Sequence, residues 1–267
     1  MALNTEKNTY TIIFAVGMVL VVGSILAFTA STLRPNIEEN RRMEKQQNIL
    51  YAMGVNSNEG SGDISFVSTD RVADAFQNNV FEQIVLEVKD GEIIKKMSRD
   101  EFLSSKAEGA GIEPYLIDGK KEQTKAKNGK SQFLPLFKGK QDDKTVYVAP
   151  MRGKGLWDAI WGYIALDENM IVRGTFFDHA GETPGLGANI KQRYFMDDFY
   201  GERLLNEEGT FKGITVAKGN NDPKNEIKDD HEVDALAGAT ITGDGVSAMI
   251  KKDLKLYLPY FKNLKTN

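Results

Sequence analysis

Apolar residues are concentrated in one stretch near the N-terminus. Residues 8–33 carry no charged side chain, and Ile, Val, Leu, Phe and Ala fill most of positions 12–28. About 20 apolar residues in a helix span the roughly 30 Å hydrocarbon core of a bilayer. A cleaved signal peptide, with its shorter apolar region of about 7–15 residues and small-residue cleavage site, fits less well. The pattern therefore predicts a membrane-spanning helix over residues 10–33, after an N-terminal tail over residues 1–9.

A polar segment follows the apolar stretch. Residues 36–53 contain no Gly or Pro and only sparse apolar positions, and Gly54 is typical of a helix end. This composition predicts a helical stalk over residues 34–55. An Asn-, Ser- and Gly-rich linker at 56–63 then leads to a soluble domain over residues 64–267.

The charges that flank the apolar stretch bear on its orientation. Arg34, Arg41, Arg42 and Lys45 follow the stretch, whereas only Lys7 and the amino terminus precede it. Because cytoplasmic segments carry an excess of cations, this count favours a cytoplasmic location for the domain. A domain of this length crosses a membrane largely regardless of such charges, so the count is a bias only.

Apolar runs predict several strands in the soluble domain. Residues 80–88 and 92–94 flank Asp90-Gly91, a pair that supplies the positive φ angles of a tight hairpin turn. The Lys-, Gly-, Gln- and Asn-rich stretch at 118–132 indicates a solvated loop. Further strands are predicted at 146–148, 161–166, 170–177 and 214–217.

Two helices are predicted in the C-terminal half. One covers part of residues 192–205. The other runs from Asp244, whose carboxylate would cap the free N–H groups, to Leu258 before Pro259. Helices and hairpins without a repeating βαβ period predict an α+β fold for this domain, not a doubly wound sheet.

The amino-acid composition excludes several kinds of partner and site. Lys and Arg number 34 against 38 Asp and Glu, and a net charge of −4 without a basic run argues against a nucleic-acid partner. The absence of cysteine excludes disulfides, thiolate-bound metals and a Cys nucleophile. The two histidines, His179 and His231, are too few and too far apart for a His-rich site, so we expect no metal ligands.

Three glycine-rich segments are the candidate binding elements. Gly-Lys-Gly-Leu-Trp at 153–157 either lets the backbone approach a ligand or is a turn with a core Trp. Glu-Thr-Pro-Gly-Leu-Gly at 182–187 either presents amides and a hydroxyl to a ligand or is a plain turn. In the third segment, 234–245, two Thr hydroxyls either support a phosphate or cap a helix. Glu182 with His179 is a candidate for an acid–base pair.

The third segment resembles a motif of known flavoproteins. Asp234, Gly238, Ala239 and Thr240 match Asp-x-x-(Ser/Thr)-Gly-Ala-Thr. This is the flavinylation motif of the membrane-anchored flavoproteins of Na⁺-translocating NADH:quinone reductases and related Rnf-type complexes. Ala237 departs from the motif, because the family usually has Ser or Thr there. The first two glycine-rich segments resemble the flavin-binding domain of the same family, in the same order along the chain.

Further segments favour the C subunit of the Na⁺-translocating enzyme over the G subunit of Rnf-type complexes. Residues 47–54, together with 155–157 and 162–166, are similar to sequences of that C subunit. The alternative from another class is a membrane-anchored domain that binds a small ligand or a partner protein without redox activity. That alternative predicts a colourless protein.

The resemblance implies that Thr240 carries FMN through a phosphodiester bond, within an FMN-binding region at about 145–258. The FMN would be a one-electron carrier in the chain from NADH to quinone, so we expect no catalytic residue here. The implied partners are the other subunits of the membrane reductase complex, a flavin transferase and membrane lipid. The family places such a domain on the periplasmic side of the bacterial inner (cytoplasmic) membrane, on a single pass, which opposes the charge count.

The resemblance also implies which residues surround the flavin. Thr242 would support the phosphate, and Glu182 and Thr183 would hydrogen-bond to the ring. Such contacts shift the energies of the flavin's charge states, so we expect this loop to tune the flavin without transferring protons. The expected flavin-site residues are Thr240, Asp234, Gly238, Ala239, Thr242, Glu182, Thr183, Leu186, Gly187, Gly155, Leu156, Trp157 and Lys218.

Overall fold

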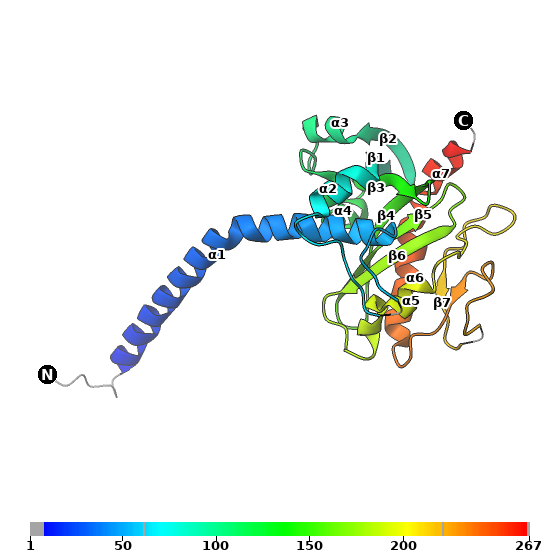
Figure 1. The fold of residues 1–267 in the computed structure, drawn as a ribbon. Coiled ribbons are helices and arrows are strands. Elements are labelled where there is room, and N and C mark those ends of the chain that lie inside the picture. The colour runs from blue at the N-terminus through cyan, green and yellow to red at the C-terminus, as the bar shows by residue number, and fades with distance from the viewer. Residues whose placement is uncertain (1–7, 61, 221, 266–267) are drawn as a thin grey trace. The chain divides into compact units, whose positions relative to one another are not determined.

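The computed structural model describes residues 8–60, 62–220 and 222–265, so most of the predicted tail lies outside it. The chain divides into two compact units, Met1–Glu44 and Lys45–Asn267. A single helix, α1 (Asn8–Ala52), begins in the first unit and ends in the second (Figure 1). It continues through Pro35, and Gly54, with a φ of 79°, follows its end.

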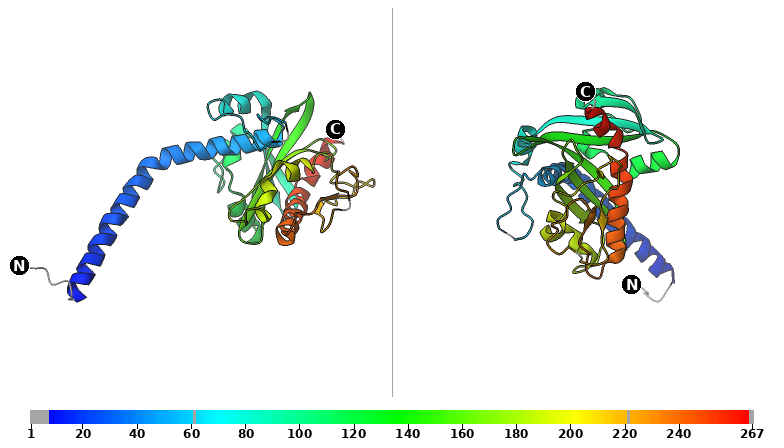
Figure 2. Two further views of the ribbon diagram at one scale, coloured as in Figure 1. Left: turned by 60° about the horizontal axis from the view of Figure 1, so that its bottom comes forward. Right: turned by 90° about the vertical axis from the view of Figure 1, so that its right-hand side faces the viewer.

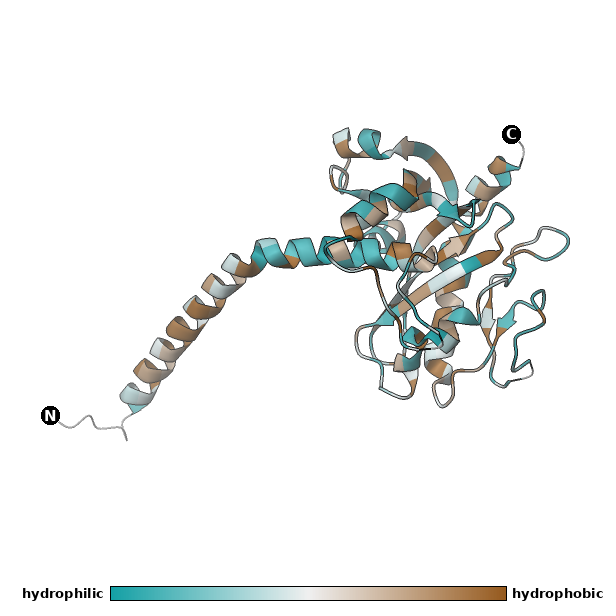
Figure 3. Ribbon diagram, in the orientation of Figure 1, coloured by the Kyte–Doolittle hydropathy of each residue, from teal (hydrophilic) through white to brown (hydrophobic). Residues whose placement is uncertain are grey.

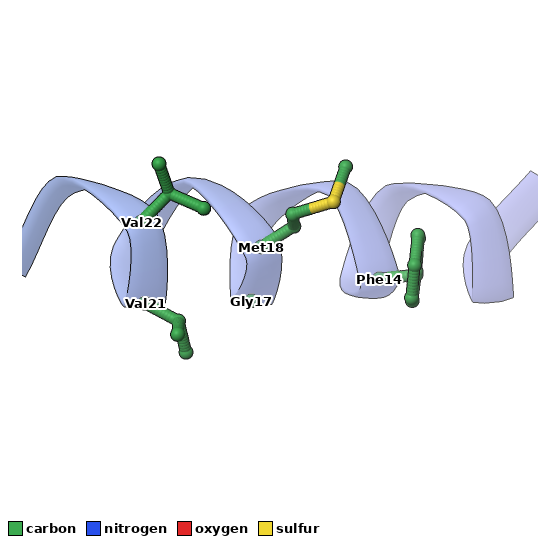
Figure 4. Close-up of a pocket in the computed structure, with 5 residues that line it drawn as sticks. All are labelled: Phe14, Gly17, Met18, Val21 and Val22. Atoms are coloured by element: carbon green, nitrogen blue, oxygen red, sulfur yellow. The ribbon is translucent and has the colours of Figure 1, made fainter. Parts of the chain in front are cut away.

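Most of the first part of α1 is coloured as apolar in Figure 3. Its most apolar 18-residue window has a mean hydropathy of 2.6, and the helix is long and apolar enough to cross a membrane. Figure 4 shows the side chains of Phe14, Met18, Val21 and Val22 around Gly17, and each of the four is about half exposed. The first unit alone does not bury these side chains, and that they lie in a membrane stays a prediction.

The second unit is built on a six-stranded antiparallel sheet in the order β2-β1-β3-β4-β5-β6 (Figures 1 and 2). Asp90 (φ 52°) and Gly91 (φ 83°) turn between β1 and β2, which confirms the predicted hairpin. The strands predicted at 146–148, 161–166 and 170–177 coincide with parts of β4, β5 and β6. The strands are β1 (Val80–Lys89), β2 (Glu92–Ser98), β3 (Gln132–Gln141), β4 (Lys144–Lys154), β5 (Ala159–Leu166) and β6 (Val172–His179).

Shorter elements complete this unit. The helix α6 packs on β4 and buries Val246, Met249, Ile250 and Leu254. Antiparallel strands with separate helices confirm the predicted α+β fold. The elements are α2 (Val72–Asn79), α3 (Arg99–Ser104), α4 (Gly119–Lys127), α5 (Arg193–Asp197), α6 (Thr240–Lys255), α7 (Leu258–Leu264), the 3-10 turns η1 (Pro114–Leu116) and η2 (Gly187–Lys191), and the parallel pair β7 (Thr215–Val216) and β8 (Glu232–Val233).

The stretch at 118–132 is mostly exposed, as predicted, but it is not a loop, because α4 fills most of it. Asp118 caps this helix by accepting hydrogen bonds from the backbone N–H groups of Lys120 and Lys121. Its inner face is polar: Glu122 is buried and accepts a hydrogen bond of 2.7 Å from the backbone N–H of Phe133. A helix that buries a carboxylate instead of an apolar stripe gives no hydrophobic periodicity to detect.

The predicted start of the C-terminal helix is also wrong. The helix α6 begins at Thr240, four residues before the predicted cap Asp244, and Ala239 precedes it without a side-chain cap. Thr240 and Thr242 therefore lie in the first turn of the helix and not ahead of it. Leu256 and Tyr257 separate α6 from α7, which has Pro259 in its first turn, where a missing N–H costs nothing.

Candidate functional site

The three glycine-rich segments meet at one carboxylate. Glu182 is 4% exposed, and its Oε2 accepts a hydrogen bond of 2.5 Å from the Thr242 hydroxyl. Its Oε1 accepts a hydrogen bond of 3.0 Å from the backbone N–H of Trp157. One side chain thus joins the loop after β4, the loop after β6 and the first turn of α6.

Two glycines leave the space that this carboxylate occupies. A Cβ on Gly155 would lie 2.5 Å from Glu182 Oε1, and a Cβ on Gly187 would overlap both Glu182 Oε2 and the Thr242 hydroxyl. Gly245, one turn further along α6, packs directly on the carbonyl oxygen of Lys154. The glycines of the three segments therefore permit close approach among the segments themselves.

Glu182 is held in its ionised form. Burial raises the pKa of its carboxyl group, but hydrogen bonds from Thr242 and from the backbone of Trp157 and Asp158, together with His179, outweigh burial. The net effect lowers the pKa below its ordinary value. The His179 imidazole does not bond to the carboxylate: its Nδ1 accepts a hydrogen bond of 3.1 Å from the Glu182 backbone N–H. The geometry thus favours a structural carboxylate over an acid–base pair.

Exposed apolar side chains surround this polar centre. Trp157 is 66% exposed, and its indole Nε1 donates a hydrogen bond of 3.2 Å to the Thr183 hydroxyl. Leu156, Leu186 and Ile241 are 45%, 42% and 58% exposed. Such large apolar groups, held at the surface beside a satisfied polar core, suit a flat, mostly apolar ring.

The two threonine hydroxyls have different environments. Thr242 is buried and its hydroxyl is bonded to Glu182, whereas Thr240 is exposed and its hydroxyl makes no hydrogen bond with the residues that the structure describes. Thr240 is the first residue of α6, where free backbone N–H groups and the helix dipole favour an anion. Gly238, with a φ of 66°, and the buried Ala239 shape the turn before it.

Lys218 and Asp234 follow the two short strands β7 and β8, and β7 packs against α6. Lys218 follows β7, and its Nζ is 4.0 Å from Asp244 on α6. Asp234 follows β8, and its backbone N–H donates to Asp198. Burial and, less strongly, Asp222 raise the pKa of the Asp234 carboxyl group.

Two residues at this site escaped the sequence reasoning. Ser247 lies one turn from Gly243 and accepts a hydrogen bond of 2.8 Å from the backbone N–H of Val216, which fixes β7 against α6. Ile241 adds an exposed apolar side chain beside Thr240. An isolated serine and an isolated isoleucine have no local pattern that could have identified them.

The fold and the site define an FMN-binding domain that follows a long apolar N-terminal helix. A family model described as FMN-binding domain matches residues 155–255, which include Glu182 and the whole of the segment 234–240. The C subunit of the Na⁺-translocating NADH-quinone reductase of Yersinia pestis is 30% identical over 91% of this chain and 87% of its own. The C subunit of the Pseudomonas aeruginosa enzyme is 29% identical over 92% and 91%.

A solved structure gives the same result. The structure of the C subunit from Parabacteroides distasonis superposes with a TM-score of 0.66 at 28% identity, covering 86% of this chain and 96% of that chain. The chain belongs to the family of the C subunit of the Na⁺-translocating NADH-quinone reductase. The resemblance found in the sequence is confirmed, including the preference for this subunit.

Proposed function

We propose that this protein carries FMN covalently on Thr240 and acts as a one-electron carrier in a Na⁺-translocating NADH:quinone oxidoreductase. The observation that carries the proposal is the contrast between the two hydroxyls of the motif. Thr240 is exposed at the helix start and without a partner among the described residues, whereas Thr242 is committed to Glu182. Only the first is accessible to a flavin transferase.

The site fits FMN in both charge and shape. The phosphate would lie at the first turn of α6, with Lys218 as a nearby cation. The ring would lie against Trp157, Leu186 and Ile241, whose exposed faces provide the apolar contact. FMN supplies the reversible one-electron chemistry, while the protein supplies attachment and orientation.

Glu182 acts in this proposal by holding the site together. Both of its oxygens already accept hydrogen bonds from protein groups, and Thr183 already accepts one from Trp157. The effect of Glu182 and Thr183 on the flavin is therefore to fix the distance between the loop at 182–187, which would contact the ring, and α6, which bears Thr240. The negative charge of Glu182 also disfavours negative charge on the ring, which tunes the potential without proton transfer.

The proposal includes a location, for which the apolar part of α1 supports a membrane anchor and the family resemblance supports the periplasmic side. Residues 10–33 would span the inner membrane once, with the domain on the periplasmic side, where a flavin transferase meets Thr240. Membrane lipid and the other subunits of the reductase complex would cover the exposed apolar residues of the span.

The test is flavin attachment to the full chain co-expressed with a flavin transferase. Thr240→Ala should give a folded chain without flavin fluorescence on a denaturing gel, and Thr240→Ser, which keeps the hydroxyl, should retain the label. Thr242→Ala should keep the label as well, although it removes the hydrogen bond to Glu182. A label that survives Thr240→Ala but not Thr242→Ala would assign attachment to the other hydroxyl. A wild-type chain that is colourless after purification would support a ligand-binding domain without redox activity.

A further inference from the structure

Asp198 connects α5 to both sides of β8. Its Oδ2 accepts a hydrogen bond of 3.1 Å from the backbone N–H of Asp234, the first residue of the attachment motif. Its carbonyl oxygen accepts hydrogen bonds from Asn225 Nδ2 and, at 3.3 Å, from Lys228 Nζ. One residue therefore fixes α5 to the loop before β8 and to the motif after it.

The motif needs such a contact at its start. Residues 234–239 between β8 and α6 form no helix or strand, and their internal backbone bond is a turn from Ala239 N–H to the Leu236 carbonyl. Their far end is fixed because α6 packs on β4. The bond from Asp234 to Asp198 fixes the near end, so that both ends of the segment before Thr240 are held.

Lys228 also contacts a buried carboxylate. Glu202 is 0% exposed, its Oε1 lies 3.5 Å from Lys228 Nζ, and neither of its oxygens has a hydrogen-bond partner among the described residues. Burial raises the pKa of Glu202 to about 7; Lys228 opposes the rise, and the Asp230 carboxylate adds to it. Lys228 and Asp230 are the described charged groups that face it.

We propose that Asp198 is a positioning residue for flavin attachment, holding the segment before Thr240 through the backbone of Asp234, with Lys228 and Glu202 supporting it. This inference rests on the proposed function, because it concerns how Thr240 is presented to the transferase. In the attachment step the Thr240 oxygen bonds to the FMN phosphorus of FAD. The pyrophosphate bond breaks, and AMP leaves while the hydroxyl proton goes to solvent. A misplaced hydroxyl slows such a step steeply.

The arrangement makes the positioning depend on pH. Above pH 7, ionised Glu202 attracts Lys228 and keeps its ammonium group beside the Asp198 carbonyl. Below pH 7, protonated Glu202 no longer attracts Lys228, whose side chain is 34% exposed and is then free to move into solvent. We therefore compare the attachment rate of wild type with that of a variant without the Glu202 charge. The ratio of the two rates should be larger at high pH than at low pH.

The experiment measures the initial rate of labelling of the purified full chain, in detergent, by a flavin transferase with FAD. Asp198→Ala should slow labelling about 10-fold, which corresponds to one lost hydrogen bond. Asp198→Asn should stay within about twofold of wild type, because its amide oxygen accepts the same bond. Asp197→Ala, which removes the exposed neighbouring carboxylate, is the matched control and should label at the wild-type rate. Wild type should be about threefold faster than Glu202→Gln at pH 8 and equal to it at pH 6.

Three results would overturn the inference: Asp198→Ala labelled at the wild-type rate, Asp198→Asn as slow as Asp198→Ala, or the same wild-type to Glu202→Gln ratio at both pH values. Lys228→Met is the second variant in case Asp198→Ala does not fold, and it should behave like Glu202→Gln at pH 8. A wild-type chain that takes no flavin, or a Thr240→Ala chain that does, would instead contradict the proposed function. Normal labelling of wild type with no effect at Asp198 would contradict this inference alone.

Discussion

Replacing Glu202 by Gln should stabilise the protein at high pH and leave it unchanged at low pH. Burial keeps the carboxyl group protonated in the folded chain up to a pKa of about 7, whereas an exposed Glu in the unfolded chain titrates near 4.5. Between these values the folded state binds more protons than the unfolded state. The free energy of unfolding therefore falls as the pH rises from 4.5 to 7.

The magnitude follows from the difference of about 2.5 pKa units. At about 1.36 kcal/mol per unit, the ionisation of Glu202 should make the free energy of unfolding of wild type about 3 kcal/mol lower at pH 8 than at pH 4. Gln has no charge to bury, so Glu202→Gln should be more stable than wild type by about 3 kcal/mol at pH 8. At pH 8 this variant should then be more stable than wild type and yet slower to accept flavin. If Glu202 had a purely structural role, stability and labelling rate would change in the same direction.

The assay is urea unfolding of the full chain in detergent, followed by tryptophan fluorescence at pH 5 and pH 8. Glu207→Gln, which replaces an exposed carboxylate, is the control and should follow wild type at both pH values. Parallel stability curves for wild type and Glu202→Gln across this range would refute the reasoning, because they would show that Glu202 titrates alike in both states.

Other predictions concern the site and the anchor. Gly187→Ala should destabilise the domain by about 1–3 kcal/mol and weaken flavin attachment, since its Cβ would overlap Glu182; Gly181→Ala, whose Cβ meets nothing closer than 3.8 Å, should be neutral in the same urea titration. Glu182→Gln should shift the flavin potential in a redox titration and slow turnover modestly; an unchanged potential with a thousandfold loss of turnover would restore Glu182 and His179 as a proton-transfer pair. Deletion of residues 1–33 should give a domain soluble without detergent, and protease added to spheroplasts should digest the domain of the full chain; protection would favour the orientation that the charge count indicates.

The fold was predictable where neighbouring residues determine it. The Asp90-Gly91 turn fixes the register of the first hairpin, and the uncharged run at 8–33 is unmistakable as an apolar helix. The sequence failed at α4, because Glu122 and Gln123 bury polar atoms whose partners, Phe133 and Asp253, are remote in the sequence. Polar burial has no periodic signal.

In the candidate site, too, local motifs were predictable from the sequence, whereas contacts between remote residues were not. The glycine-rich segments and Thr240 could be singled out in the sequence because short motifs contain them. That Glu182 would contact Thr242 instead of being free to reach a ligand depends on how the loop after β6 meets α6, and no local pattern records this contact. Asp198 and Glu202 lie in no motif, and the roles proposed for them rest on the bond from the Asp234 backbone to Asp198, the burial of Glu202 and the contacts that both residues make with Lys228.

The hydrogen bonds that close the site join residues far apart in the sequence. The Glu182–Thr242 bond spans 60 positions, and the bond of 2.7 Å from the Arg152 backbone N–H to Asp253 on α6 spans 101. Contacts of such separation form late in folding, after the entropy of closing long loops has been overcome. On the proposed assignment, a nascent or truncated chain without α6 lacks the acceptor hydroxyl, because Thr240 is the first residue of that helix. If Thr240 bears the flavin as proposed, loading would therefore require that α6 has formed and packed on β4.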